Sequence, residues 1–248
     1  MEMFNLNQDY PYLEEINEGI LKFFNTVPLQ SGSVLDIGCG RGVLGQKIKE
    51  RGFSVWGIEQ NITAVQAAQK KLDRVIAADI TDVTLLSQEL HEKTFDYLIF
   101  SDVLEHVADP LSLLKHYRQF CHNNTQVLVS LPNVANWQTR LSVLFGQFNY
   151  KDSGVMDRTH LRFFTFKTAK RLLIESGYTI EQVDCTPYII RAVLPLIKYL
   201  FKKEDTATIA NSKSFQFYMN YLYPIEYYFS LTWKSLFAFR IILVAKKN

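Results

Sequence analysis

The chain has 248 residues and is almost electrically balanced, with 27 Lys and Arg against 25 Asp and Glu. Its length suits one α/β domain with an elaboration, and the 48% hydrophobic and 21% charged content is ordinary for a globular protein. No segment approaches the ~20 apolar residues of a membrane-spanning helix, and no signal peptide is predicted. Three widely separated cysteines indicate a reduced, cytoplasmic protein and show no metal-binding spacing.

The first predicted element is a helix between Tyr10 and Thr26. Apolar and aromatic residues recur there at near-helical spacing, and Pro28 closes the pattern. We expect this helix to pack beside a sheet. Tyr12 either reaches the cofactor site or is an ordinary core tyrosine.

The second element, Val34–Gly45, combines a buried strand, a glycine turn and the start of a helix (VLDIGCGRGVLG). Gly38, Gly40 and Gly42 let the backbone turn sharply beside a ligand. The segment also satisfies the dinucleotide pattern G-x-G-x-x-G. However, a pyrophosphate at this helix start would be repelled by Asp36. S-adenosylmethionine (SAM) has no phosphate and carries a sulfonium and an ammonium group, so it suits an acidic site.

Three later segments continue the strand-and-acid pattern. Phe53–Glu59 (FSVWGIE) ends in an acid that could accept hydrogen bonds from ribose hydroxyls. Val75–Ile80 (VIAADI) ends in an acid and an apolar residue that could seat an adenine ring. Phe95–Pro110 (FDYLIFSDVLEHVADP) contains a fourth strand and the loop after it. Together with Val34–Gly42, these segments resemble, in order and spacing, the motifs of class I SAM-dependent methyltransferases.

This resemblance implies a Rossmann-like α/β fold. Its seven-stranded sheet is mostly parallel, the last strand is antiparallel between the fifth and sixth, and helices cover both faces. Strands are predicted at Gln126–Leu131, Thr179–Cys185 and Phe239–Ala245. The resemblance also implies SAM as cofactor and S-adenosylhomocysteine as product. The expected cofactor-binding residues are Asp36, Gly38, Gly40, Glu59, Gln60, Asp79, Ile80, Ser101, Asp102 and Tyr12.

Residues 133–164 form a predicted insertion after the fifth strand, on the substrate side of the sheet. Its sequence resembles that of bacterial methyltransferases that accompany glycosyltransferases in glycan and related biosynthetic pathways. The expected substrate-binding residues are Asn133, Asn136, Arg140, Tyr150, Asp157 and Arg158. His160, and after it His106, are the candidate general bases. Each histidine could instead hold its loop in place. No metal is predicted, although Glu105 and His106 could contribute ligands.

Residues 188–236 form a predicted helical appendage that the basic fold does not need, which leaves 1–187 with 237–248 as the methyltransferase domain. From Tyr188 onward there are nine Lys and Arg against three Asp and Glu, and aromatic residues are frequent. Arg191, Lys198 and Lys202 fall on one helical stripe. Three interpretations stay open: a lid over the active site, a homodimer face, or peripheral contact with the inner face of the membrane. A nucleic-acid partner is not expected, because basic residues are few and no binding module is present.

The predicted reaction is methyl transfer from SAM to a small or medium-sized acceptor, most naturally a hydroxyl of a glycan, sugar or secondary metabolite. Two alternatives stay open. The acceptor could be a small amine, which needs no base, or the protein could bind SAM as a non-catalytic partner of another protein.

Overall fold

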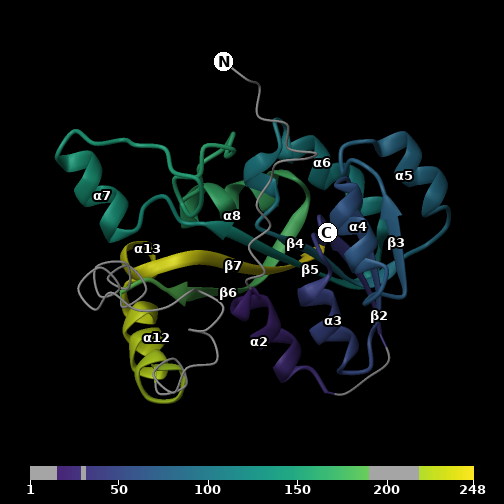
Figure 1. Ribbon diagram of the computed structural model, residues 1–248, viewed down its shortest axis with the longest axis horizontal. Helices are drawn as coiled ribbons and strands as arrows, with labels where there is room; N and C mark the ends of the chain where they lie inside the picture. Colours follow the sequence, from purple (N-terminus) through teal and green to yellow (C-terminus); the bar gives the residue numbers. More distant parts are fainter. Residues whose placement is uncertain (1–15, 29–31, 190–217) are drawn as a thin grey trace.

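Seven strands form a single sheet in the order β3-β2-β1-β4-β5-β7-β6 (Figure 1). The computed structural model describes residues 16–28, 32–189 and 218–248. Neighbouring strands from β3 to β5 are parallel, whereas β7 is antiparallel to both β5 and β6. This topology confirms the predicted methyltransferase sheet. The strands are β1 (Ser33–Ile37), β2 (Ser54–Glu59), β3 (Arg74–Ala77), β4 (Phe95–Ser101), β5 (Cys121–Pro132), β6 (Tyr178–Pro187) and β7 (Ala238–Lys247).

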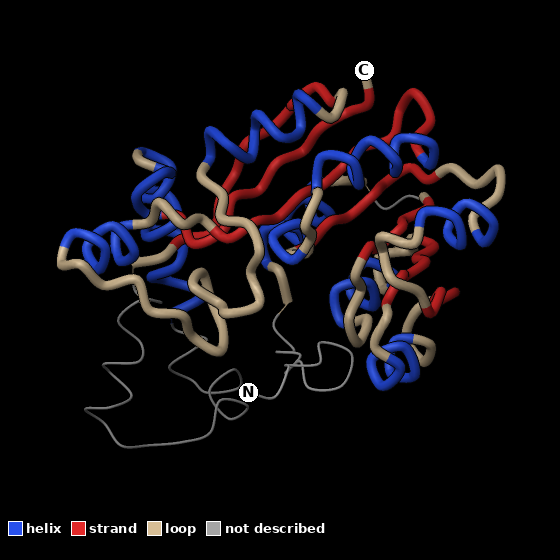
Figure 2. The backbone as a smooth tube through the Cα atoms, turned by 90° about the horizontal axis from the view of Figure 1, so that it is seen from above, coloured by secondary structure: helices blue, strands red, loops and turns tan. Residues whose placement is uncertain are grey.

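Helices cover both faces of the sheet, as Figure 2 shows from above. One face carries α5 (Val83–Glu89), α6 (Pro110–Tyr117) and α8 (Phe166–Glu175). The other carries α2 (Glu18–Thr26), α3 (Val43–Lys49) and α4 (Ile62–Ala68). Two short 3₁₀ helices, η1 (Leu104–His106) and η2 (Arg118–Phe120), flank α6. Within the described residues, α2 begins at Glu18 because the side chain of Asn17 caps it by accepting from the amide of Ile20. Tyr12 lies outside these residues.

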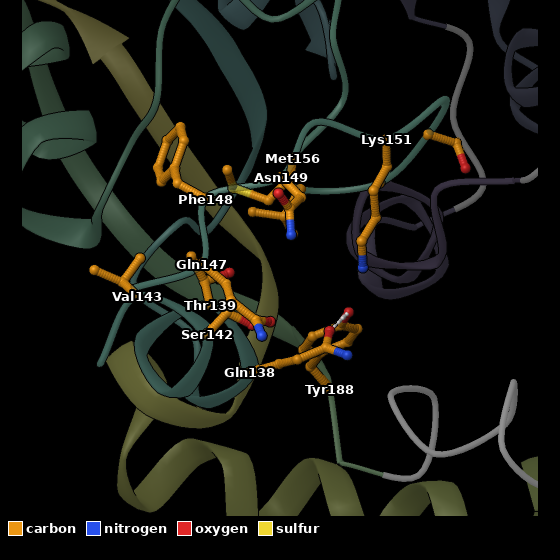
Figure 3. Close-up of a pocket in the computed structure, with 13 residues that line it drawn as sticks. Gln138, Thr139, Ser142, Val143, Gln147, Phe148, Asn149, Lys151, Met156 and Tyr188 are labelled. Atoms are coloured by element: carbon orange, nitrogen blue, oxygen red, sulfur yellow. Dashed lines mark hydrogen bonds between the residues drawn. The ribbon is translucent and has the colours of Figure 1, made fainter. Parts of the chain in front are cut away.

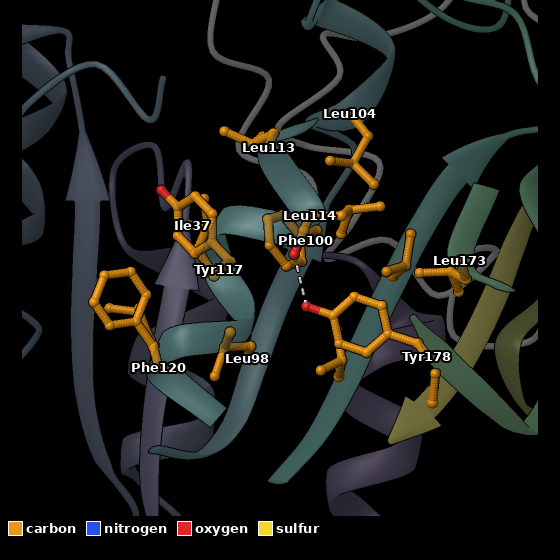
Figure 4. Packing of buried hydrophobic residues seen from close by; sticks show 14 of the residues in the cluster. Ile37, Leu98, Phe100, Leu104, Leu113, Leu114, Tyr117, Phe120, Leu173 and Tyr178 are labelled. Atoms are coloured by element: carbon orange, nitrogen blue, oxygen red, sulfur yellow. Dashed lines mark hydrogen bonds between the residues drawn. The ribbon is translucent and has the colours of Figure 1, made fainter. Parts of the chain in front are cut away.

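Each face of the sheet has its own apolar core. On the α6 side, Leu98 and Phe100 of β4 pack against α6 and α8, and Figure 4 shows Tyr178 among them. The hydroxyl of Tyr178 donates to the carbonyl of Leu114 (2.9 Å), so this buried ring leaves no polar group unsatisfied. On the opposite side, Phe24 of α2 is fully buried against the sheet. Burial of each such apolar side chain contributes about 1.5–3 kcal/mol to the free energy of unfolding.

The insertion and the appendage are tied to the end of the sheet. The insertion holds α7 (Trp137–Leu144), and the described part of the appendage forms η3 (Tyr218–Leu222), α12 (Tyr223–Thr232) and α13 (Lys234–Phe237). The side-chain amide of Asn133 donates to the carbonyls of Ser235 (3.1 Å) and Ala238 (3.0 Å). The indole of Trp137 donates to the carbonyl of Tyr188 (2.8 Å). Both added segments are therefore anchored where β5 and β7 meet.

The stripe of Arg191, Lys198 and Lys202 lies outside the described residues, so the lid, dimer and membrane interpretations stay predictions. Among the helices that the structure does describe, none combines the length and the apolar character needed to cross a membrane.

Gly57, in the middle of β2, is required by close packing. A Cβ there would lie 2.5 Å from Sγ of Cys39 and 2.9 Å from Cδ1 of Leu72, and both neighbours are buried. We expect Gly57→Ala to lower the free energy of unfolding by about 1–3 kcal/mol, because overpacking forces its neighbours to move. Thermal unfolding measures this loss. Gly32→Ala is the matched control, since its Cβ would make only ordinary contacts at 3.4 Å. Equal melting temperatures for the two variants would contradict the packing argument.

Candidate active site

The glycine turn after β1 is held against the end of β2. Gly38 (φ 73°) and Gly40 (φ 53°) both adopt the left-handed conformation that favours glycine. The amides of Gly38 and Cys39 donate to the carbonyl of Ile58 (2.9 and 3.0 Å), and the amide of Gly40 donates to Oε2 of Glu59 (2.9 Å). The turn therefore carries Asp36 and Glu59 together at one edge of the sheet.

These two carboxyl groups are both buried at this edge of the sheet. Asp36 is 2% and Glu59 4% exposed. Burial, with the charge of Glu59 as a smaller contribution, raises the pKa of Asp36 from 3.8 to about 7. A cationic ligand would offset this repulsion, whereas a diphosphate would add to it. The turn thus fits a phosphate-free cation such as SAM. Oε1 of Glu59 also accepts from the amide of Asn61 (2.8 Å), and a carboxylate has further lone pairs for ribose hydroxyls.

The loop after β3 presents the predicted adenine-binding residues. Asp79 is exposed, and its Oδ1 accepts from the amide (2.8 Å) and hydroxyl (2.7 Å) of Thr81. The carbonyl of Ile80 accepts from the buried hydroxyl of Tyr117 (3.0 Å), which fixes the loop to α6. Gln60 is exposed just beyond β2. All these residues share the sheet edge of Asp36, because β3, β2, β1 and β4 are parallel neighbours.

Asp102, at the end of β4, is held in place by three elements. Its φ of 53° is in the left-handed region, which is uncommon for a residue other than glycine. Its carboxylate accepts from the hydroxyl of Ser130 (2.8 Å) and from Nε of Arg240 (2.8 Å). The side-chain amide of Asn17 donates to the hydroxyls of Ser101 (3.0 Å) and Ser130 (2.8 Å). The predicted cofactor residues Ser101 and Asp102 are therefore rigidly positioned.

Sequence reasoning missed Asn17, Ser130 and Arg240 in this network. Arg240 did carry a signal, because it is a charge inside the otherwise apolar strand FRIILVA. Asn17 and Ser130 carried none, since a lone polar residue at a helix start or a strand end has many ordinary explanations.

The two candidate bases meet although they are far apart in the sequence. The rings of His106 and His160 lie 4.9 Å apart between centroids. Burial, with the neighbouring ring of His160 as a second cause, lowers the pKa of His106 from 6.5 to about 4. Burial also lowers the pKa of His160. Both imidazoles are thus neutral at pH 7. Glu105 lies beside them, and its burial raises the pKa of its carboxyl group well above the usual value.

The predicted substrate residues divide into two groups. Asn133 and Asn136 are fully buried, and Asn136 caps α7 by accepting from the amide of Thr139 (3.0 Å). Asp157 is buried and accepts from the amide of Thr159 (2.8 Å), so it shapes the loop that carries His160.

The remaining three lie on the surface of the insertion. Arg140 donates to the carbonyl of Ala135 (2.6 Å), and Arg158 pairs with Asp152. Tyr150 is 55% exposed. Only Asp157 among the six lies next to the histidine pair, and the substrate roles stay predictions.

A pocket of about 170 Å³ opens within the insertion, between α7 and the loop that follows it (Figure 3). Figure 3 shows Gln138 joined to the hydroxyl of Tyr188, a hydrogen bond of 2.5 Å. The wall residue Val155 also accepts a hydrogen bond from the ring of His160 through its carbonyl, at 3.2 Å from Nδ1. The pocket and the histidine pair therefore share a wall. Its lining residues are Gln138, Thr139, Ser142, Val143, Gln147, Phe148, Asn149, Lys151, Ser153, Gly154, Val155, Met156 and Tyr188.

Comparison with known families identifies the family of the chain. A family model described as a methyltransferase domain matches residues 8–183, which include the glycine turn and every strand up to β6 except the last residues of β6. The chain belongs to the class I SAM-dependent methyltransferases. We therefore expect the acidic sheet edge to be the SAM site of this methyltransferase.

Relatives and solved structures agree with this assignment. The methyltransferase is 34% identical over 205 residues to a ubiquinone biosynthesis O-methyltransferase of Thiobacillus denitrificans, covering 81% of this chain and 85% of that protein. The Ralstonia nicotianae protein of the same name is 31% identical over 112 residues, which is 44% of this chain and 47% of that one.

Two solved structures share the fold at low sequence identity. A SAM-dependent methyltransferase from Archaeoglobus fulgidus has a TM-score of 0.62 at 20% identity, covering 95% of both chains. Magnesium protoporphyrin IX methyltransferase from Synechocystis, solved with bound S-adenosylhomocysteine, has a TM-score of 0.54 at 14% identity, covering 94% of this chain and 85% of that one.

The raised pKa of Asp36 predicts a pH-dependent stability. Between pH 3.8 and about 7 the unfolded carboxyl group is ionised while the folded one keeps its proton, so the free energy of unfolding falls as pH rises. The substitution Asp36→Asn removes this pH-dependent loss of stability, because an amide does not ionise. We expect the cofactor-free variant to melt several degrees above wild type at pH 8 and by much less at pH 4, since 1 kcal/mol shifts the Tm by about 2–4 °C at this size. Asp152→Asn, at an exposed carboxylate, is the control. A pH-independent difference for Asp36→Asn would contradict the burial argument.

Glu59 is predicted to be the strongest single contributor to cofactor affinity. Glu59→Gln keeps the shape of the side chain but removes its charge and one acceptor. We expect the Kd for S-adenosylhomocysteine, measured by calorimetry, to rise about 10–100-fold, because a hydrogen bond to a charged group contributes ~1.5–3 kcal/mol. Glu50→Gln, an exposed acid at the end of α3, should leave the Kd unchanged. An unaltered Kd for Glu59→Gln would remove this residue from the ribose site.

Proposed function

We propose that this methyltransferase transfers the methyl group of SAM to a hydroxyl oxygen of a small or medium-sized acceptor. The observation that carries the proposal is the meeting of His106 and His160 immediately beyond Asp102, at the cofactor edge of the sheet. Neutral imidazoles beside the donor site are of use to an acceptor that must lose a proton. The names of the relatives, which are O-methyltransferases, support the same choice.

The chain's own residues would perform three tasks in this reaction. Bound SAM supplies an electrophilic methyl group on a positively charged sulfur. Asp36 and Glu59 hold the cofactor through charge and hydrogen bonds, and the network around Asp102 fixes the end of β4. The insertion closes over this edge and positions the acceptor for in-line attack, a contribution worth ~7–11 kcal/mol in well-aligned reactions. The histidine pair handles the hydroxyl proton, which typically adds 10²–10⁴-fold.

The pocket beside α7 suits part of an uncharged or weakly acidic acceptor. Its polar lining consists mainly of amides and hydroxyls, with Lys151 as its single charged member among the described residues. A sugar or a hydroxylated ring offers matching hydrogen-bonding groups. We therefore propose a hydroxylated small molecule of a glycan or secondary-metabolite pathway as the acceptor.

A panel experiment tests this function. Purified protein is incubated with SAM carrying a labelled methyl group and with separate sets of phenols, sugars, simple alcohols and small amines. We expect label in the hydroxylated compounds and none in the amines, and hydrolysis-stable ether linkages in the products. Labelling of amines alone would favour the N-methyltransferase alternative. S-adenosylhomocysteine binding without any transfer would favour a non-catalytic role.

A further inference from the structure

Glu105, His106 and His160 form a cluster that the sequence does not reveal. One potential ligand atom from each side chain lies within 4.8 Å of the other two. The backbone enforces this meeting, because the amides of Leu161 and Arg162 both donate to the carbonyl of Glu105 (2.8 and 3.0 Å). His160 is thereby delivered from the insertion to the 3₁₀ turn η1 that follows β4.

The carboxylate of Glu105 lacks the partners that such a group requires. The residue is 1% exposed, and neither of its side-chain oxygens has a hydrogen-bond partner among the residues that the structure places. Nε2 of His160, whose imidazole is neutral at pH 7, lies 4.0 Å from Oε1, and the charge of Arg240 acts to lower the pKa of this carboxyl group. Buried carboxylates are normally hydrogen-bonded, paired with a charge or bound to a metal. Two buried oxygens without a hydrogen-bond partner, next to two neutral imidazoles, are groups that one metal ion can satisfy together.

Both imidazoles are oriented by hydrogen bonds on the opposite side of their rings. Nδ1 of His160 lies 3.2 Å from the carbonyl of Val155. Nδ1 of His106 lies 3.3 Å from the carbonyl and 3.2 Å from the hydroxyl oxygen of Thr159, whose own proton goes to Asp157 (2.7 Å). These acceptors place the ring proton on Nδ1 and make Nε2 the unprotonated nitrogen. Metal-binding histidines are held in this way by their outer partners.

We propose that Glu105, His106 and His160 bind one divalent first-row transition-metal ion, such as Zn²⁺ or Mn²⁺. Two imidazoles and one carboxylate are a ligand set that such ions accept, with positions left for other ligands. Modest closure of the cluster brings the ligand atoms to bonding distance. Asp102 is already engaged by Arg240 and Ser130, so it contributes negative potential from outside the ligand set.

The ion would give the proposed hydroxyl acceptor its chemistry, and this part of the inference rests on the proposed function. A hydroxyl oxygen bound at an open position of the ion loses its proton more readily, as metal-bound water does. The proton leaves to solvent, and the resulting oxygen attacks the methyl carbon while the carbon–sulfur bond breaks. With the ion bound, His106 and His160 act as its ligands, and the ion takes over the part in removing the proton that the proposed function assigns to the imidazoles.

Metal binding is tested without turnover. The full chain is stripped with a chelator and titrated with ZnCl₂ and MnCl₂ in a calorimeter, with MgCl₂ as a comparison. We expect one ion per chain for Zn²⁺ or Mn²⁺, and at least a tenfold weaker Kd for Glu105→Gln and for His160→Ala. His91→Ala, a histidine exposed after α5, should bind like wild type. S-adenosylhomocysteine affinity and the melting temperature confirm that each variant is folded.

The outcomes separate this inference from the proposed function. No ion bound to the stripped wild type, or undiminished binding by Glu105→Gln, overturns the metal site. Binding that requires Glu105 and His160, together with methyl transfer that stops on chelation and returns with the metal, supports both proposals. Binding with no transfer to any acceptor upholds the site while the function fails. Transfer that ignores chelation overturns the role of the ion in the reaction.

Discussion

The burial of two carboxyl groups at one edge of the sheet is the constraint on which this site depends. Asp36 and Glu59 are brought together because the glycine turn hydrogen-bonds to the end of β2. Burial, with the charge of Glu59 as a smaller contribution, raises the pKa of Asp36. Such an arrangement costs stability in the free protein and is relieved by a cationic ligand. At the predicted cofactor site this feature favours a sulfonium over a diphosphate, and we expect binding to add to the stability of the fold.

The last strand, β7, adds residues to the same edge of the sheet at which β1 to β4 end. β7 enters antiparallel beside β5, which brings Arg240 to the carboxylate of Asp102 and Ala238 to the side chain of Asn133. The antiparallel strand thus supplies a positive charge to the donor side and an anchor to the insertion. A wholly parallel sheet would present neither group in this way. The antiparallel direction of β7 therefore determines where Arg240 and Ala238 lie in the site.

The donor half of the site could be predicted from the sequence, and the acceptor half could not. Asp36, Glu59 and Asp79 follow apolar strands directly, and the ends of parallel neighbours must share one edge of the sheet. Glu105 and His160 meet only through two backbone hydrogen bonds from an irregular insertion, which has no periodicity to interpret. Asn133 and Asn136 were predicted to bind substrate because they are polar and close to the strand end. Their side chains form hydrogen bonds with the backbone, and their substrate roles stay predictions.

This contrast has a physical origin. SAM is the same molecule in every enzyme of the family, so the strands and the turn that hold it can be regular and local in sequence. An acceptor is specific to each enzyme, and it is met by segments added between the strands. Here the added segment carries His160 to a buried acid whose side-chain oxygens have no hydrogen-bond partner in the described part of the chain. An insertion that merely shielded SAM from water would have no reason to bring a carboxylate and two imidazoles into one dry cluster. The chemistry of the acceptor is therefore to be sought at Glu105, where the sheet and the insertion join.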